Sequence, residues 1–536
     1  MRKAIAVFLS ALLSVSVLAG CQGKDAKETE SPAARTDSQE TVAQVGETEK
    51  SANPEGQPES GKHLNVGYYQ LKSLDPGANS WEATRVGVGE RLFKLNDELK
   101  LEPWLVDTYE QVDDLTWKFT LKDGIRFTNG KPLDGAAVKA CLERTIEKND
   151  RAVSMLNIDT IEADGQAITV TTKDINAALP TNMADMVCTI LDVETLETEG
   201  AIPVGTGPFV ITSMTEEVYE LEANRDYWNG VPKLDTVTIK IINEGNALAM
   251  ALDNGEVDIT FQMPTENVAQ FEGRDGFTVT KETGSRGQTV YFNYNSPALA
   301  ELDVRKAITM AVDRETLANV VNKGNTEAAT AIFPVSFAYG DVEGVPYDPE
   351  GAKKLLADAG YTDSDGDGIL EKDGQPLTIK FLTYGSRGSV LPTMCEAMQS
   401  MLKEVGVQID IELNDYDPHI ELLKKGEFDM ALNSNIMAPV ADPQYFTDIL
   451  LKTGASYNYG GYSNPEVDGL IEQLDREFDP EQRVELAKQI QEKVVEDCGF
   501  LELGHQKYQV AAREAVTGYA TQGTELYFLS ENTDIN

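Results

Sequence analysis

The sequence predicts an α/β protein with at least two lobes, and three observations support this fold class. The first is a β-α-β unit, with expected strands at 377–384 and 407–413 around an expected helix at 390–405. Such a unit implies parallel strands joined by a right-handed crossover. The second is the length of 536 residues, which is enough for two or three domains. The third is a hydrophobic fraction of 41%, which is typical of globular proteins.

The charge excludes some classes of partner. The chain has 89 acidic residues against 46 lysines and arginines, a formal net charge of −43. Nucleic acids and anionic lipid surfaces both select for clustered basic residues. We therefore expect no nucleic-acid partner.

The N-terminus predicts export. Arg2 and Lys3 precede an apolar run, and small residues lead to Cys21, so residues 1–20 have the composition of a signal peptide. The segment Leu18-Ala19-Gly20-Cys21 resembles a bacterial lipobox, which implies cleavage before Cys21 and lipidation there, palmitate included. The alternatives are a plain signal peptide and a single membrane anchor, although the apolar run is short for a span.

Residues 21–62 are expected to form a disordered tether behind the lipidated cysteine. From residue 22 onward they contain no Leu, Ile, Phe, Trp or Tyr. Such a segment buries too little apolar surface to offset its ordering entropy. We therefore expect a folded body from residue 63 onward.

Periodicity predicts the elements of the body in chain order. Alternating patterns predict strands at 64–69, 115–121, 158–172, 237–242, 290–295, 428–432, 500–503 and 508–511. Apolar residues at helical spacing predict helices at 81–93, 135–148, 177–187, 245–252, 304–312, 348–360, 418–425 and 479–496. Asp348-Pro349 and Asp479-Pro480 are N-cap and N1 pairs that open two of these helices.

Residues that carry chemistry are scarce in this chain. His63, His419 and His505 lie far apart in sequence, and Cys141, Cys188, Cys395 and Cys498 form no C-x-x-C pair. This pattern argues against a zinc site and a dense disulfide framework, so we expect the four cysteines to be buried apolar side chains. There is no G-x-S-x-G or H-E-x-x-H motif, and we expect neither an enzyme nor a cofactor.

One acidic loop resembles the start of a calcium-binding loop. Asp363, Asp365 and Asp367 alternate with Gly366 and Gly368, as the first ligands of such a loop do. The twelfth position is Gly374 rather than Glu, and Glu371 could replace that ligand only in a contracted loop. The alternative interpretation is a turn rich in Asp and Gly that leads into a hairpin.

Blocks spread over the body resemble the peptide/nickel class of extracellular solute-binding proteins (family 5), which serve ABC importers. The first block extends from Gly89-Glu90-Arg91-Leu92-Phe93 to the helix near Ile146. Others are Gly205-Thr206-Gly207-Pro208-Phe209, Asn224-Arg225-Asp226-Tyr227-Trp228, Asp303 to Ile308, Tyr347 to Gly360 and Asp442-Pro443, in the order typical of the family.

This resemblance implies a two-lobed, periplasmic-binding-protein-like fold with mixed sheets flanked by helices and an additional inserted α/β domain. Lobe I would comprise 63–82, 190–295 and 506–536, the extra domain 83–189, and lobe II 296–505. The resemblance also implies that the two lobes close on a ligand around a hinge.

The resemblance implies candidate ligand-binding residues as well. Arg151 stands where metal-chelate members hold carboxylates, and the other candidates by family placement are Trp81, Arg85, Arg286, Asn433, Asn435 and Gln444. The sequence departs from the family pattern elsewhere: Met183 to Val187 replaces an expected arginine, Asn433 to Val440 lacks a tryptophan, and Pro439 stands near an expected acid. A nickel chelate and an oligopeptide therefore both remain open as ligands.

These expectations define a function. The protein would be a monomer anchored by lipid on the extracellular face of the cell membrane, or on the periplasmic side in a Gram-negative host. It would capture a small polar ligand and deliver it to the permease of an ABC transporter with its cytoplasmic ATPase. The alternatives are a ligand-binding sensor and an extracellular enzyme on the same scaffold.

Overall fold

The computed structural model of the protein describes residues 61–71, 73–386, 390–520, 524 and 526–536. The expected signal peptide, Cys21 and the expected tether up to residue 60 lie outside the described residues. The chain divides into two units, Met1–Gln57 and Pro58–Asn536, and the second is described below. Within the described ranges, no helix has both the length and the hydrophobicity needed to cross a membrane.

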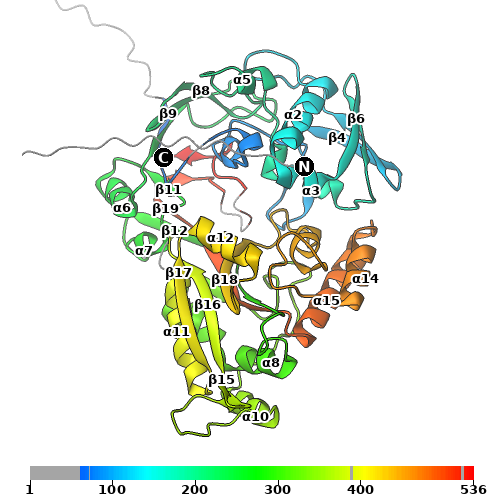
Figure 1. Ribbon diagram of the computed structural model, residues 1–536. Coiled ribbons are helices and arrows are strands. Elements are labelled where there is room, and N and C mark those ends of the chain that lie inside the picture. Colours follow the sequence, from blue (N-terminus) through cyan, green and yellow to red (C-terminus); the bar gives the residue numbers. More distant parts are fainter. Residues whose placement is uncertain (1–60, 72, 387–389, 521–523, 525) are drawn as a thin grey trace, which may run out of the picture. The chain divides into compact units, whose positions relative to one another are not determined.

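An eleven-stranded mixed sheet forms the centre of the second unit (Figure 1). Its strands follow the order β17-β16-β18-β12-β19-β11-β1-β10-β9-β8, and the eleventh strand, β13, pairs with β19 outside this order. The bounds are β1 His63–Tyr68, β8 Phe209–Met214, β9 Val218–Ala223, β10 Thr236–Ile241, β11 Ile259–Phe261, β12 Phe277–Phe292, β13 Thr326–Ala328, β16 Thr378–Tyr384, β17 Gln408–Asn414, β18 Met430–Ile436 and β19 Phe500–Arg513. Parallel pairing of β16 with β17 confirms the predicted β-α-β unit.

Strands β12 and β19 join two halves of this sheet. We call β8, β9, β10, β1 and β11 half-sheet A, and β16, β17 and β18 half-sheet B. The antiparallel pairing of β12 with β19 runs from Phe277 and Arg513 to Tyr291 and Phe500, with register shifts between Thr283 and Thr289. The irregular register places a bend between the two halves.

The lengths of β12 and β19 correct the sequence prediction. Residues 290–295 were expected to form a short strand, whereas β12 has 16 residues and ends at Phe292. Two strands were expected at 500–503 and 508–511, whereas β19 is continuous over 14 residues. The glycine and polar residues at 504–507 hide the strand in the sequence, because their backbone pairs with β12 and β13 regardless of side-chain pattern.

Helices cover both faces of half-sheet B (Figure 1). Ile379 and Phe381 pack with α8 (Leu302–Ala311), α10 (Pro349–Asp358) and α11 (Val390–Glu404). On the opposite face, Leu382 packs with α12 (Tyr416–Lys425), α14 (Pro465–Leu474) and α15 (Pro480–Glu496). Successive residues of a strand point to opposite faces, so this division defines a three-layer α/β/α half.

Helices α6 (Gly245–Asn254) and α7 (Thr265–Val268) cover one face of half-sheet A. Gly67 of β1 leaves room for Leu248 of α6, and α7 packs in the same apolar cluster. The other face of β1 presents Leu64, Val66 and Tyr68 to residues from the loop near Phe528. Helices α6, α7 and α11 therefore lie on one face, which we call the α11 face.

A second sheet belongs to the expected extra domain. Its order is β4-β5-β7-β6, with β4 Val106–Asp113, β5 Thr116–Leu121, β6 Ile158–Asp164 and β7 Ala167–Thr172, and α2 (Gly135–Lys148) packs on it. The remaining α-helices and strands of the described residues are α1 Glu82–Arg85, α3 Asp150–Leu156, α4 Leu179–Asn182, α5 Val193–Glu197, α9 Arg314–Thr316, α13 Gln444–Phe446, β2 Phe93–Leu95, β3 Leu101–Pro103, β14 Glu371–Lys372, β15 Gln375–Pro376, β20 Val516–Thr517 and β21 Asp534–Ile535. The domain boundaries given above stay a prediction.

The helix predicted at 81–93 is much shorter in the structure. Helix α1 covers only Glu82–Arg85, because Gly87 adopts φ +73 and turns the chain out of the helix. Gly89 then packs closely on Thr189, and a β-carbon added to Gly89 would lie 2.4 Å from the methyl group of Thr189.

The predicted helix caps and buried cysteines are confirmed. Asp348 caps α10 and Asp479 caps α15. Cys141, Cys188, Cys395 and Cys498 are buried free thiols.

The buried carboxylate of Glu90 connects three of the family-like blocks. Its Oε1 accepts a hydrogen bond from Tyr227 at 2.6 Å, and its Oε2 accepts bonds from Trp228 at 2.9 Å and Thr206 at 2.7 Å. The side chain is fully buried, and this burial raises the pKa of Glu90 to about 7 although the three donors oppose the shift. The spacing of these blocks is therefore explained by one hydrogen-bonded cluster.

We predict that Glu90 makes stability depend on pH. The folded pKa of about 7 exceeds the ordinary value of 4.5. The folded state therefore keeps a proton that the unfolded state loses, and stability should fall as pH rises from 4.5 to 7, by up to about 3 kcal/mol. Glu90→Gln should flatten this part of the profile in chemical denaturation at several pH values. An unchanged slope in Glu90→Gln would contradict the assignment.

Candidate ligand-binding site

Arg151, Trp81 and Arg85, three of the candidates chosen from the sequence, lie close together in the structure. The guanidinium carbon of Arg151 lies 5.7 Å from the centre of the Trp81 ring, and that of Arg85 lies 5.1 Å from it. Trp81 precedes α1, which carries Arg85, and Arg151 is the second residue of α3. Two cations thus share one indole ring, an arrangement that cation–π attraction stabilises.

Tyr445 of α13 completes this group from a distant part of the chain. Arg151 Nε donates to Tyr445 Oη at 3.3 Å, and the Arg151 guanidinium lies 5.2 Å from the centre of the Tyr445 ring. Residues from α1, α3 and α13 therefore converge on one position. We call Trp81, Arg85, Arg151 and Tyr445 the Arg151 cluster.

Asp185 is the main partner of Arg151. Arg151 Nη1 donates to Asp185 Oδ1 at 3.0 Å, and Nη2 donates to Oδ2. Asp185 is fully buried, and it lies within the segment Met183 to Val187, where the family pattern has an arginine. Burial alone would lower the pKa of Arg151, but Asp185 and Tyr445 raise it above its ordinary value, so the guanidinium stays charged.

Arg91 adds an unbalanced positive charge near the same segment. It is fully buried, its Nη1 lies 2.6 Å from Met186 Sδ, and its guanidinium carbon lies 4.8 Å from the centre of the Tyr527 ring. Its Nε and Nη2 have no hydrogen-bond partner among the described residues. Sequence reasoning missed Arg91 as a charged group of the site because its burial against Met186 depends on a contact with a distant segment of the chain.

Tyrosines extend the Arg151 cluster towards half-sheet B. Burial and then the neighbouring Tyr445 raise the pKa of Tyr457, and burial and then Tyr457 raise that of Tyr459. Tyr459 packs edge-on against Tyr291 of β12, with ring centres 5.9 Å apart. Aromatic rings with polar hydroxyls suit a ligand that has both apolar and polar parts.

Asn433 and Asn435 of β18 lie on the same face of the sheet as Tyr291 of β12. Asn435 Nδ2 donates to Tyr291 Oη at 2.9 Å, and Asn433 Oδ1 lies 2.5 Å from Nε2 of the buried His419. Asn433 and His419 are both buried, so their polar contact belongs to the interior of the protein. Asn435 is half-buried and lies nearer to the tyrosines.

Gln444 takes part in a separate buried network. Arg483 Nη2 donates to Asp442 Oδ1 at 2.7 Å and to Gln444 Oε1 at 3.3 Å. Gln444 Nε2 donates to Asp448, whose pKa is raised to about 7 by burial and by the nearby Asp475. This network explains the Asp442-Pro443 block, because it holds α13 and therefore Tyr445 in place.

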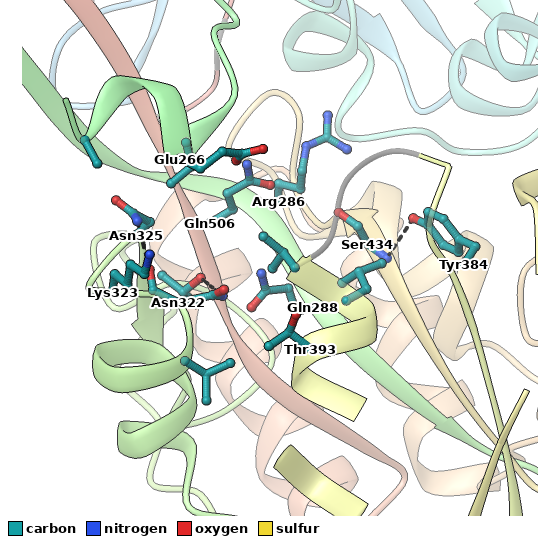
Figure 2. A pocket seen from close by; sticks show the side chains of 16 residues that line it. Glu266, Arg286, Gln288, Asn322, Lys323, Asn325, Tyr384, Thr393, Ser434 and Gln506 are labelled. Atoms are coloured by element: carbon teal, nitrogen blue, oxygen red, sulfur yellow. Dashed lines mark hydrogen bonds between the residues drawn. The ribbon is translucent and has the colours of Figure 1, made fainter. Parts of the chain in front are cut away.

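Arg286 lies elsewhere, at a cavity of about 550 Å³. Figure 2 shows this cavity, which is lined by α7, β12, the segment 321–326, α11 and β18. Arg286 is paired in register with Ile436, and Asn435 with Gly287, so Arg286 and Asn435 point to opposite faces of the sheet. The candidates chosen from the sequence are thus divided between two places.

The acidic loop at 363–371 is compact. Carboxylate oxygens of Asp363, Asp365, Asp367 and Glu371 all lie within 4.8 Å of one another. Several already accept backbone N–H groups, for example Asp363 from Gly366 at 2.7 Å. Both the turn interpretation and the calcium interpretation accommodate this geometry, so calcium binding stays a prediction.

Comparisons with known proteins identify the class. Residues 100–458 match the family described as bacterial extracellular solute-binding proteins, family 5. The chain belongs to this family, and the fold prediction is confirmed.

The similar proteins are binding proteins of transport systems. The nickel-binding protein NikA of Staphylococcus aureus is 30% identical, with 89% of this chain and 95% of that protein covered. The oligopeptide-binding protein AppA of Bacillus subtilis is 26% identical, with 97% and 96% covered. The crystal structure of the nickel ABC transporter from Bacillus halodurans matches with a TM-score of 0.78 and 28% identity, and 88% of this chain and 100% of that chain are covered.

We predict that Arg151→Ala destabilises the protein by about 3–5 kcal/mol, because it leaves the carboxylate of Asp185 buried without its counter-ion. The double variant Arg151→Met/Asp185→Leu should recover much of this loss. Chemical denaturation measures both. Arg225→Ala is the matched control, because Arg225 and its partner Asp235 are exposed and such a pair contributes less than about 1 kcal/mol. Equal effects of Arg151→Ala and Arg225→Ala would contradict the prediction.

Proposed function

We propose that the protein is the lipid-anchored, ligand-capturing component of an ABC importer and that its ligand is a small metal chelate. Convergence of α1, α3 and α13 on Arg151 is the observation that carries this proposal. A ligand at this place would contact all three segments and hold them together. Closure of two lobes on a ligand is one of the ways in which binding proteins respond to a ligand.

The residues of the Arg151 cluster favour a chelate over a bare metal ion. Its guanidinium groups pair with carboxylates, and none of its four side chains is a carboxylate, imidazole or thiolate that would ligate a bare metal ion. Within the described ranges, the one group of three or more closely spaced His, Cys, Asp or Glu residues is the loop at 363–371. A metal ion at the Arg151 cluster would therefore bring its own ligands.

The charge of the cluster fits a ligand that presents carboxylate groups. Asp185 balances Arg151, and Glu82, 3.2 Å away, balances Arg85. Arg91 keeps an unbalanced charge close by, with two nitrogens unpartnered among the described residues. A NikA crystal structure from Staphylococcus aureus contains Ni(L-His)₂, and that protein is 30% identical to this chain. An oligopeptide is the second candidate ligand, because AppA of Bacillus subtilis has been crystallised with a nonapeptide.

We expect a nickel–histidine complex to bind the protein from Lys62 onward and to reduce its radius of gyration in X-ray scattering. Arg151→Lys keeps a charge opposite Asp185 but removes the planar, forked guanidinium, and it should weaken binding about tenfold or more. Arg476→Lys is the matched control, because Arg476 is an exposed residue. A nonapeptide is titrated in parallel. Saturable binding without a change in scattering would contradict closure, and binding of the peptide alone would contradict the chelate.

We expect Cys21→Ser to release the protein from membranes, because it removes the thiol that the lipobox presents for lipidation. A single lipid chain gives only marginal binding, and stable anchoring needs more than one. Fractionation of cells followed by mass spectrometry of the N-terminus measures both location and modification. A Cys21→Ser protein that stays with the membrane would contradict the lipid anchor.

A further inference from the structure

The cavity beside Arg286 is separate from the Arg151 cluster. It has a volume of about 550 Å³, which is within the range of small-molecule sites. Gln288 and Ser434 line it as a register pair, and β12 residues at alternate positions, Val290 and Phe292, pack with α11. The cavity therefore lies on the α11 face, whereas Tyr291 and Asn435 lie on the other face.

The cavity is built from both halves of the large sheet. Thr265 and Glu266 of α7 belong to the side of half-sheet A, and Leu391 of α11 belongs to that of half-sheet B. Between them, Arg286 and Gln288 lie within the part of β12 where the register with β19 is irregular. Figure 2 shows the side chains of Glu266 and Arg286 above the cavity and that of Gln288 within it.

The charge of the lining differs from that of the whole protein. The chain carries a formal charge of −43, yet the lining has two cations, Arg286 and Lys323, against one acid, Glu266. Neither cation forms an ion pair within the described part of the chain. Two unpaired cations at one cavity of an acidic protein favour an anion.

Gln288 adds a requirement for a hydrogen-bond donor. Its side chain is 2% exposed, and its Oε1 has no partner among the described residues. A buried acceptor without a donor costs about 1–3 kcal/mol, so a ligand hydroxyl or N–H at this oxygen would be favoured. The apolar lining by Val321, Val390 and Leu391 suits a carbon skeleton.

We propose that this cavity is a second binding site, which takes a small organic carboxylate that also carries a hydroxyl or N–H donor. Arg286 and Lys323 bind its carboxylates, and Gln288 accepts a hydrogen bond from its donor. Because the lining comes from α7, β12 and α11, the bound molecule holds the two halves at one angle. The site is independent of the ligand proposed for the Arg151 cluster.

Citrate is a suitable probe, because it has three carboxylates and one hydroxyl. Isothermal titration of the protein from Lys62 onward with citrate should show saturable binding. Arg286→Gln and Lys323→Gln should each weaken binding about tenfold or more, as expected for the loss of a charge-assisted hydrogen bond. Arg476→Gln, an exposed arginine elsewhere, is the matched control and should bind citrate as the wild type does.

Several outcomes would overturn the proposal. The first is the absence of saturable citrate binding, and the second is equal citrate binding by Arg286→Gln and the wild type. The third is binding of inorganic phosphate as tight as that of citrate, which would show that the carbon skeleton and hydroxyl of the ligand contribute nothing to affinity. Hydrogen exchange at residues 283–289 should slow when citrate binds. Unchanged exchange would contradict the claim that the bound molecule holds half-sheets A and B at one angle. Arg151→Lys should bind citrate normally, which separates this proposal from the proposed function.

Discussion

The pairing of β12 with β19 is the constraint on which the rest of the structure depends. These two strands join half-sheet A to half-sheet B, and their register is irregular between Thr283 and Thr289. Strands β12 and β19 both continue through this region, so the halves are connected without a loop. Side chains from β12 then point alternately to two faces, and each face carries one of the places where a ligand is proposed.

The Arg151 cluster shows how buried charge organises the site. Asp185 holds the guanidinium of Arg151, the network of Arg483, Asp442 and Gln444 holds α13, and Tyr445 joins the two. Each ion pair is costly to break from one side, because the remaining charge would stay buried. Geometry of this kind keeps aromatic rings and N–H donors in fixed positions, which reduces the ordering that binding requires.

The candidate site could be predicted only in part. Arg151, Trp81 and Arg85 were named from their place in a family-like pattern, and they lie together. Asn433 and Gln444 were named in the same way, but their side chains form buried contacts with His419 and Arg483. Arg91 and Asp185 were not named as site residues, because their burial and pairing depend on contacts with segments 95 and 34 residues away in the sequence. Arg286 was named without any sign that it faces a different cavity.

The sequence by itself determined the α/β class, the helix caps at Asp348 and Asp479, the parallel β-α-β unit and the family, because these features depend on local periodicity, turn chemistry and ordered blocks. Only the tertiary structure decided that Glu90 connects Thr206, Tyr227 and Trp228, and that residues 500–513 form one strand. It also decided that Arg286 lines a cavity that Arg151 does not line. These features depend on which distant segments share a hydrogen bond or a sheet, and local pattern contains no information on that choice.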